Sequence, residues 1–316
     1  MTILVTGAAG FIGANLTRHL IDKGHQVIGL DAYKTGSNRD NIVKLKESTL
    51  FDCVNRDLTK TYTNSLLDFL EEHNVENIIH LAAESHVDRS IEGNKPFWET
   101  QVMGTQALME AAYQYGKIKC FITQITDEVY GEVPEGTPAP KEGSKFDPNP
   151  FYAASKVAQY YVGKSYWKTH KLPVISTFPV NNYGPRQWPE KLIPKFVTLL
   201  LEGKKVPLMK STHFQRDWLP VIDMAKALEL LLEKGQPGED YNVGANNHCT
   251  NLELTYKILK LLDKGEDSIE IIPDRTTHDC RYAVDSSKLI ELGWKVEEDF
   301  DEYLAYTVDF YKGNQI

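Results

Sequence analysis

The sequence predicts an α/β fold, in which a doubly wound parallel sheet is followed by a smaller C-terminal α/β cap. Short apolar runs alternate with helix-length segments whose apolar residues are three and four apart, as in a sheet covered by helices on both faces. A glycine-rich turn follows the first apolar run directly. After about Asn182 the alternation fades, the elements shorten and proline-bearing turns become common. The cap is therefore expected over the carboxyl ends of the strands, where doubly wound folds bind ligands.

The predicted elements follow one another along the chain. Strands are expected at residues 3–5, 26–30, 50–54, 77–81, 119–123 and 174–178. Helices are expected at residues 11–23, 66–73, 96–115 and 151–170. A helical pattern at 221–232 and an apolar run at 241–243 indicate that the chain returns to the main sheet. The predicted domains are residues 1–182 with a returning segment near 221–245, and the remainder of 183–316.

The composition excludes several classes of protein. With 41% hydrophobic and 25% charged residues among 316, the chain should fold around one large core or two joined cores. The net charge of −9, with no basic stripe, argues against a nucleic-acid partner. The four cysteines share no CxxC spacing and suggest neither a metal site nor a disulfide framework. No signal peptide is expected before the first strand, and no apolar run approaches the ~18 residues of a membrane span. We expect a cytoplasmic protein.

The glycine-rich turn predicts a dinucleotide site of the Rossmann type. It lies between the first strand and the first helix, which is the order that this site requires. Gly7 allows the tight turn, Gly10 lets the backbone approach a pyrophosphate, and Gly13 permits close packing of the helix. The free N–H groups at the start of the helix would bind the phosphate charge.

Two acidic residues extend this prediction. Asp31 ends the second strand, where a carboxylate can accept both hydroxyls of the adenosine ribose and would repel a 2'-phosphate. NAD is therefore favoured over NADP, although the nearby Lys34 leaves NADP open. Asp57, after the third strand, could contact the adenine or could equally cap a helix.

The chemistry is expected at two further segments. Tyr152 and Lys156 are four residues apart on one predicted helix, so they share one face. An ammonium beside a phenol lowers the phenol's pKa, and the positive charge of oxidised nicotinamide would lower it further. Tyr152 could then act as a base on a hydroxyl group. Asp127 and Glu128 follow Thr126 at the carboxyl end of the fifth strand, where adjacent carboxylates are costly unless they are solvated or used. A solvated strand end is the alternative for this pair.

Over almost its full length the chain resembles the nucleotide-sugar 4,6-dehydratases of the extended short-chain dehydrogenase/reductase type, most closely the dTDP-glucose 4,6-dehydratases. The matching segments occur in the family's order. They are Thr-Gly-Ala-Ala-Gly-Phe-Ile-Gly from Thr6, His-Leu-Ala-Ala-Glu-Ser-His-Val-Asp-Arg-Ser-Ile from His80, Thr-Asp-Glu-Val-Tyr-Gly from Thr126, Tyr-x-x-x-Lys from Tyr152, Asn-Asn-Tyr-Gly-Pro from Asn181, Pro-Glu-Lys-Leu-Ile-Pro from Pro189, Arg-Asp-Trp-Leu from Arg216 and His-Asp-x-Arg-Tyr-Ala from His278.

The resemblance implies an elimination of water without net consumption of NAD. Tyr152, steadied by Thr126, would take the proton of the sugar 4-hydroxyl as hydride passes from C4 to NAD, while Lys156 holds the cofactor ribose. Glu128 would remove the C5 proton and Asp127 would protonate the departing 6-hydroxyl, after which hydride returns to C6.

The site residues that the resemblance implies form two sets, and no metal is implied. The cofactor set is Gly7, Gly10, Phe11, Ile12, Gly13, Asp31, Asp57, Leu58, Leu81, Ala82, Ala83, Tyr152 and Lys156. The substrate set is Ser85, Asn181, Lys191, Leu192, Arg216, Asn251, Arg275 and His278, of which Arg216, Arg275, His278 and Asn181 should meet the diphosphate and ribose.

Some positions depart from the family's usual pattern. Ile125 and Val180 replace serines, Gln101 replaces an asparagine, and the loops at 33–41 and 209–215 differ from those of dTDP-glucose enzymes. UDP-glucose or UDP-N-acetylglucosamine therefore stay open as substrates, as does inversion at C5. A 4-epimerase needs no acid pair and is disfavoured by Asp127 and Glu128, and the intact set of reactive residues disfavours a protein that only binds. A homodimer is expected through the helices at 96–115 and 151–170.

Overall fold

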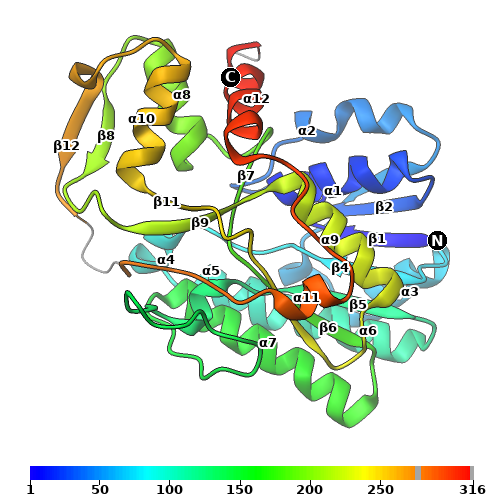
Figure 1. The fold of residues 1–316 in the computed structure, drawn as a ribbon. Coiled ribbons are helices and arrows are strands. Elements are labelled where there is room, and N and C mark those ends of the chain that lie inside the picture. Colours follow the sequence, from blue (N-terminus) through cyan, green and yellow to red (C-terminus); the bar gives the residue numbers. More distant parts are fainter. Residues whose placement is uncertain (275–278, 314–316) are drawn as a thin grey trace.

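The computed structural model describes residues 1–274 and 279–313, and its centre is a seven-stranded parallel sheet (Figure 1). The strand order is β10-β6-β5-β4-β1-β2-β3. The strands are β1 (Thr2–Thr6), β2 (Gln26–Asp31), β3 (Phe51–Asn55), β4 (Asn77–His80), β5 (Cys120–Gln124), β6 (Val174–Pro179) and β10 (Asp240–Val243). All neighbours in this sheet run parallel. The reversal of strand order beside β1 and β4 is the point at which doubly wound sheets bind ligands.

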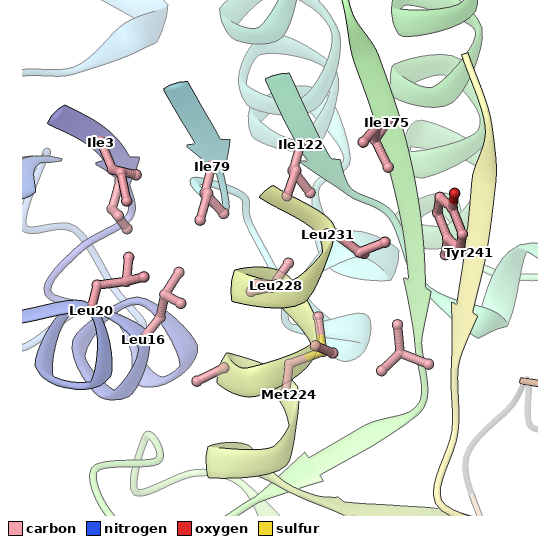
Figure 2. Packing of buried hydrophobic residues seen from close by; sticks show 14 of the residues in the cluster. Ile3, Leu16, Leu20, Ile79, Ile122, Ile175, Met224, Leu228, Leu231 and Tyr241 are labelled. Atoms are coloured by element: carbon pink, nitrogen blue, oxygen red, sulfur yellow. The ribbon is translucent and has the colours of Figure 1, made fainter. Parts of the chain in front are cut away.

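Helices cover both faces of this sheet because successive side chains of each strand point to opposite sides. Ile3, Ile79 and Ile122 face α1 (Phe11–Asp22) and α9 (Val221–Lys234), where Leu16, Leu20, Met224, Leu228 and Leu231 complete the core (Figure 2). The neighbouring residues Leu4, Ile78 and Phe121 join the core of the other face, which α3 (Thr63–Glu72), α6 (Thr105–Tyr115) and α7 (Phe151–His170) cover. Each of these fully buried side chains contributes about 1.5–3 kcal/mol to folding.

The second half of the chain builds a smaller unit with its own core. A three-stranded sheet has the order β11-β9-β7, and β8 pairs in parallel with β12. The bounds are β7 (Asn181–Tyr183), α8 (Leu192–Leu201), β8 (Val206–Met209), β9 (Gln215–Pro220), β11 (His248–Thr250), α10 (Asn251–Leu261), β12 (Ile269–Ile272) and α12 (Phe300–Gly313). Tyr183, Phe196, Trp218, Leu254 and Leu304 are central to its core. The chain therefore leaves the main sheet after β6 and re-enters it at β10.

Short elements complete the described chain. They are α2 (Asp40–Val43), α4 (Val87–Glu92), α5 (Lys95–Phe97) and α11 (Ser287–Glu291), and the 3₁₀ turns Lys44–Glu47, Leu58–Lys60, Asp127–Tyr130 and Glu266–Ser268. Within the described residues, we find no helix with the length and apolar character to cross a membrane.

The predicted fold class is confirmed, and the predicted strands of the main sheet lie within two residues of the observed ones. The helix expected over residues 96–115 is partly wrong. It divides into α5, a π-helical segment Trp98–Gly104 and α6. The wider π turn carries Gln101, whose side chain is fully buried and hydrogen-bonds to the loop after β4. A pattern of apolar spacing does not distinguish a π turn from the α-helix around it.

Candidate active site

Backbone geometry at the turn after β1 suits a dinucleotide. Gly7 has φ = 72°, a left-handed conformation that favours glycine, and a Cβ placed there would lie 3.0 Å from the Ala82 nitrogen. A Cβ on Gly13 would lie 2.0 Å from the Gly7 carbonyl oxygen, so α1 can pack against the turn only with glycine at this position. The N-terminus of α1 therefore opens directly onto the cavity beside this turn.

Asp31 closes one end of this cavity. Its buried carboxylate accepts hydrogen bonds from the main-chain N–H groups of Ala9 and Tyr33 and from the Ser37 hydroxyl. These donors tie the glycine turn to the loop after β2. Each carboxylate oxygen can accept more than one hydrogen bond, so Asp31 keeps acceptor capacity for ribose hydroxyls.

Asp57 lies on the same wall and is held by protein partners. It caps the 3₁₀ turn Leu58–Lys60 by accepting from the Thr59 N–H, and it pairs with Lys34 at 2.8 Å. The hydrogen bonds from Lys34 and Thr59 outweigh the opposing effect of burial and lower the pKa of Asp57. The capping alternative for Asp57 is therefore realised, and the charge of Lys34 is directed to Asp57.

All thirteen residues of the predicted cofactor set line this one cavity. The residues are Gly7, Gly10, Phe11, Ile12, Gly13, Asp31, Asp57, Leu58, Leu81, Ala82, Ala83, Tyr152 and Lys156. The cavity runs from the carboxyl ends of β2 and β3 across the glycine turn to α7. This elongated shape, with a helix N-terminus at its middle and an acid at one end, matches the chemistry of a dinucleotide.

Tyr152 and Lys156 lie at the inner end of the cavity. Lys156 is fully enclosed, and its ammonium donates to the Gln124 carbonyl oxygen at 2.8 Å and to Gln159 Oε1 at 2.9 Å. Burial lowers the pKa of Lys156 to about 7. Burial and the nearby Glu128 charge raise the pKa of Tyr152, so the predicted lowering of that pKa by Lys156 is wrong for the chain alone. A positive charge must come from elsewhere for Tyr152 to ionise near neutral pH.

The acid pair lies beside Tyr152 where β5 ends. Thr126 caps the 3₁₀ turn Asp127–Tyr130 and donates from its hydroxyl to Asp127 Oδ1 at 3.2 Å. Asp127 is buried, and burial followed by the Glu128 charge holds its pKa well above the usual range. Glu128 is only half-buried. The two adjacent carboxyl groups are therefore unequal: Asp127 holds its proton more strongly than an ordinary aspartic acid, in contrast to the solvated strand end that was the alternative.

A second cavity adjoins the first and shares Tyr152 with it. Its lining includes the acid pair and, from the predicted substrate set, Ser85, Asn181, Lys191, Leu192, Arg216 and Asn251. Arg275 and His278, the other two members of that set, lie outside the described residues. The structure thus brings the predicted reactive residues to the junction of two cavities.

Arg216 is fixed on the wall of the second cavity. Its guanidinium donates to the carbonyl oxygens of Gln215, Cys280 and Asp279, and it stacks on the Tyr282 ring at 4.5 Å. Arg216 is 9% exposed, so the alternative of a surface ion pair does not hold. A guanidinium held in this way is oriented before a diphosphate binds.

The sequence analysis missed several residues that line these cavities. The rim where the two cavities meet carries a cluster in which Arg89 donates to both oxygens of Glu190, at 2.7 and 2.9 Å, and His86 lies 3.4 Å from the same carboxylate. Lys191, which was predicted, donates to the Ser85 carbonyl oxygen at 2.8 Å beside this cluster. Other lining residues that were not predicted include Glu84, Gln124, Gln187, Trp188, Trp218, Asp279 and Tyr282. The segments from His80 and Pro189, which the sequence analysis singled out, could have directed attention to the rim.

Comparison with known proteins agrees with this geometry. Residues 4–307 match the family model for GDP-mannose 4,6 dehydratase. The chain is 41% identical to the low-salt glycan biosynthesis protein Agl12 of Haloferax volcanii over 99% of each chain. It is 40% identical to a dTDP-glucose 4,6-dehydratase of Streptomyces niveus, covering all of this chain and 94% of that one.

Solved structures give the same result. DesIV, a dTDP-glucose 4,6-dehydratase of Streptomyces venezuelae crystallised with NAD, superposes with a TM-score of 0.95 at 38% identity, over 100% of this chain and 98% of that one. A UDP-glucose 4-epimerase of Thermus thermophilus in complex with NAD gives a TM-score of 0.90 at 30% identity over 99% of each chain. The chain belongs to the nucleotide-sugar 4,6-dehydratase family of extended short-chain dehydrogenases/reductases.

Proposed function

We propose that this protein is an NAD-dependent nucleotide-sugar 4,6-dehydratase that converts dTDP-glucose to the dTDP-4-keto-6-deoxy sugar and water. The observation that carries the proposal is the unequal acid pair, a buried Asp127 with a raised pKa next to a half-buried Glu128, beside Tyr152 at the junction of two cavities. An elimination needs an acid and a base on neighbouring atoms, whereas a 4-epimerase has no use for them.

The residues of this chain have distinct parts in the reaction. NAD, held by the cavity that the glycine turn, Asp31 and Lys156 line, would supply reversible transfer of hydride between the sugar and the cofactor. Tyr152 accepts the proton of the 4-hydroxyl, with the Thr126 hydroxyl in contact with the phenol. Glu128 accepts the C5 proton, and Asp127 gives its proton to the 6-hydroxyl, which leaves as water. Glu128 exchanges the C5 proton with solvent before C5 is reprotonated, and the return of hydride to C6 would restore NAD. The proton that Tyr152 accepted replaces the one that Asp127 gave, so both residues return to their starting states.

Two further proposals, the division into two domains and a homodimer, rest on where the residues lie in the fold. Residues 1–182 with the returning segment near 221–245 would bind NAD, and the remainder of 183–316 would bind the nucleotide sugar, with Arg216 on its diphosphate. A homodimer would use the helical faces that carry Trp98, Met103, Tyr113, Phe151 and Tyr161, which are large apolar side chains left exposed on the described monomer. Sedimentation of the wild type tests this, and a monomer at micromolar concentration would remove the dimer.

The reaction is tested by incubating the purified protein, with and without added NAD, separately with dTDP-glucose, UDP-glucose and UDP-N-acetylglucosamine in deuterated water. Loss of one water with solvent deuterium at C5 is expected for dTDP-glucose. The same product from only a UDP-sugar would keep the dehydratase and correct the substrate, and the C5 configuration of the product would show any inversion. An isomer of unchanged mass without deuterium would overturn the elimination in favour of an epimerase.

A further inference from the structure

Gln159 lies three residues beyond Lys156 on α7 and is fully buried. Its Oε1 accepts from the Lys156 ammonium at 2.9 Å, and its Nε2 donates to Thr123 Oγ1 at 2.9 Å. Nε2 also lies 3.4 Å from the Gln124 carbonyl oxygen. Gln159 was in neither predicted site set, and it lines neither cavity of the site.

The orientation of this amide is determined by its neighbours. Lys156 can only donate, and the Gln124 carbonyl can only accept, so the amide oxygen must face Lys156 and the amide nitrogen must face β5. The Thr123 hydroxyl accepts at the other amide hydrogen. Gln159 therefore links β5 to the ammonium in one defined orientation.

The ammonium is left with one N–H after these bonds. The Gln124 carbonyl oxygen and Gln159 Oε1 accept two of its three N–H bonds. Because these two bonds fix the rotation of the ammonium, they also fix the direction of the third N–H. The charged groups around it do not compensate its charge. Tyr152 stands on the same helix, and the nearest titratable group on β4, His80, is neutral because burial lowers its pKa to about 3. A buried cation without a carboxylate depends on neutral acceptors such as these.

We propose that Gln159 is a positioning residue, which fixes the Lys156 ammonium against β5 and keeps it charged while Tyr152 exchanges its proton. This role rests on the proposed function, since it concerns the charge state in which the Tyr152 and Lys156 pair works. It adds an outer member to the pair without contact to substrate or cofactor.

The positive charge of Lys156 determines the direction in which a substitution at Gln159 shifts the pKa of Lys156. Burial lowers the pKa of Lys156, and an acceptor at position 159 opposes that change. Gln159→Met keeps the size but removes the acceptor, so Lys156 should lose its proton at lower pH. Gln159→Glu places a carboxylate against the ammonium, so Lys156 should keep its proton to higher pH. If Gln159 had a role in packing alone, neither substitution would shift the pH at which Lys156 loses its proton.

The test follows the titration of Lys156 by NMR in full-length protein labelled with ¹³C at lysine Cε, saturated with NAD, with the signal assigned from Lys156→Met. We expect the Lys156 titration to move down by about one pH unit in Gln159→Met and up by about one unit in Gln159→Glu. The alkaline limb of kcat on the dehydratase substrate should move in the same directions. Gln106→Leu is the matched control, because Gln106 contacts Tyr166 of α7 ten residues beyond Lys156.

The two proposals fail in different ways. Opposite shifts of the Lys156 signal in a protein that dehydrates no nucleotide sugar would uphold the role of Gln159 in holding the charge and overturn the proposed reaction. Unchanged titration in both variants, with folding verified by the remaining lysine signals, would overturn the role of Gln159 whatever the wild type catalyses.

Discussion

The side-chain amide of Gln101 pairs with the main chain of Glu84 through two hydrogen bonds, accepting from its N–H at 3.1 Å and donating to its carbonyl oxygen at 3.0 Å. A third bond runs from Gln101 Nε2 to Ser155 Oγ at 3.2 Å, and Ser155 in turn donates to the Tyr152 carbonyl oxygen. The π-helical segment is thereby connected to both the cofactor loop after β4 and the start of α7. Both amide hydrogens and the carbonyl oxygen of Gln101 are thus hydrogen-bonded within the fold.

Gln101→Leu should lower both stability and activity. It leaves the main-chain N–H and C=O of Glu84 without their partner, which costs about 2–4 kcal/mol in the free energy of unfolding. Denaturant unfolding and kcat measure the two effects. Gln114→Leu on the exposed face of α6 is the control, since the Gln114 side chain bonds to Glu110 at the surface. Equal stability of the two variants would contradict the pairing.

Asp127→Asn should stop the elimination while leaving the first oxidation. The amide cannot protonate the departing 6-hydroxyl, so dehydration should fall by about 10²–10⁴-fold. Absorbance of reduced cofactor on mixing with substrate should still appear in single-turnover experiments. Full dehydration by this variant would remove Asp127 from its acid role.

The same substitution should alter the pH dependence of stability. The folded-state pKa of Asp127 is raised above its ordinary value of 3.8, so the unfolded chain releases this proton at lower pH than the folded chain does. The contribution of this group to stability is therefore fully present below that ordinary value and is lost as pH rises towards the folded pKa. Melting temperatures should show Asp127→Asn gaining on the wild type as pH rises above that ordinary value. A difference in melting temperature between the two proteins that is the same at every pH would contradict this prediction.

Glu190→Gln should weaken the binding of NAD with little change in the melting temperature. Its ion pair with Arg89 and its contact with His86 join the segment from His80 to the loop before α8 across the rim of the cofactor cavity. Exposed pairs of this kind contribute about 0–1 kcal/mol to folding, so the melting temperature should barely move. The fraction of NAD retained through gel filtration should fall several-fold. Glu202→Gln removes a comparable surface pair with Lys204 and should retain NAD as the wild type does.

Gly13→Ala should abolish NAD binding or folding. Its Cβ would lie 2.0 Å from the Gly7 carbonyl oxygen, which forces α1 away from the turn. Gly93→Ala is the control, because a Cβ on Gly93 meets nothing within 4 Å. Calorimetric titration with NAD and circular dichroism separate loss of the site from loss of the fold. Normal NAD affinity in Gly13→Ala would contradict the close packing at this turn.

The main sheet and the cavity lining could be predicted from the sequence because their signals are local. Buried strands give continuous apolar runs, and the motifs at Thr6, Thr126 and Tyr152 each begin at the end or the start of one element. The bonds from Gln159 to Thr123 and from Arg89 to Glu190 join residues 36 and 101 positions apart. No spacing rule connects such pairs, since only the folded sheet brings them together.

The pKa of Tyr152 is a second property that the sequence pattern could not predict. Spacing of four residues placed Tyr152 and Lys156 on one helical face, as observed, but burial determines the direction of the pKa shift. Burial is a property of everything packed around α7, including the loop after β4 and the acid pair. A helix pattern contains no information about those neighbours.

The late return of β10 to the sheet has a consequence for synthesis on the ribosome. Until residues 221–243 have emerged, β6 has an open edge and the core beside α1 lacks Met224, Leu228 and Leu231. A nascent chain that ended after β6 would expose both to solvent and to neighbouring chains. Chaperone engagement should therefore be strongest on chains released between the end of β6 and the end of β10.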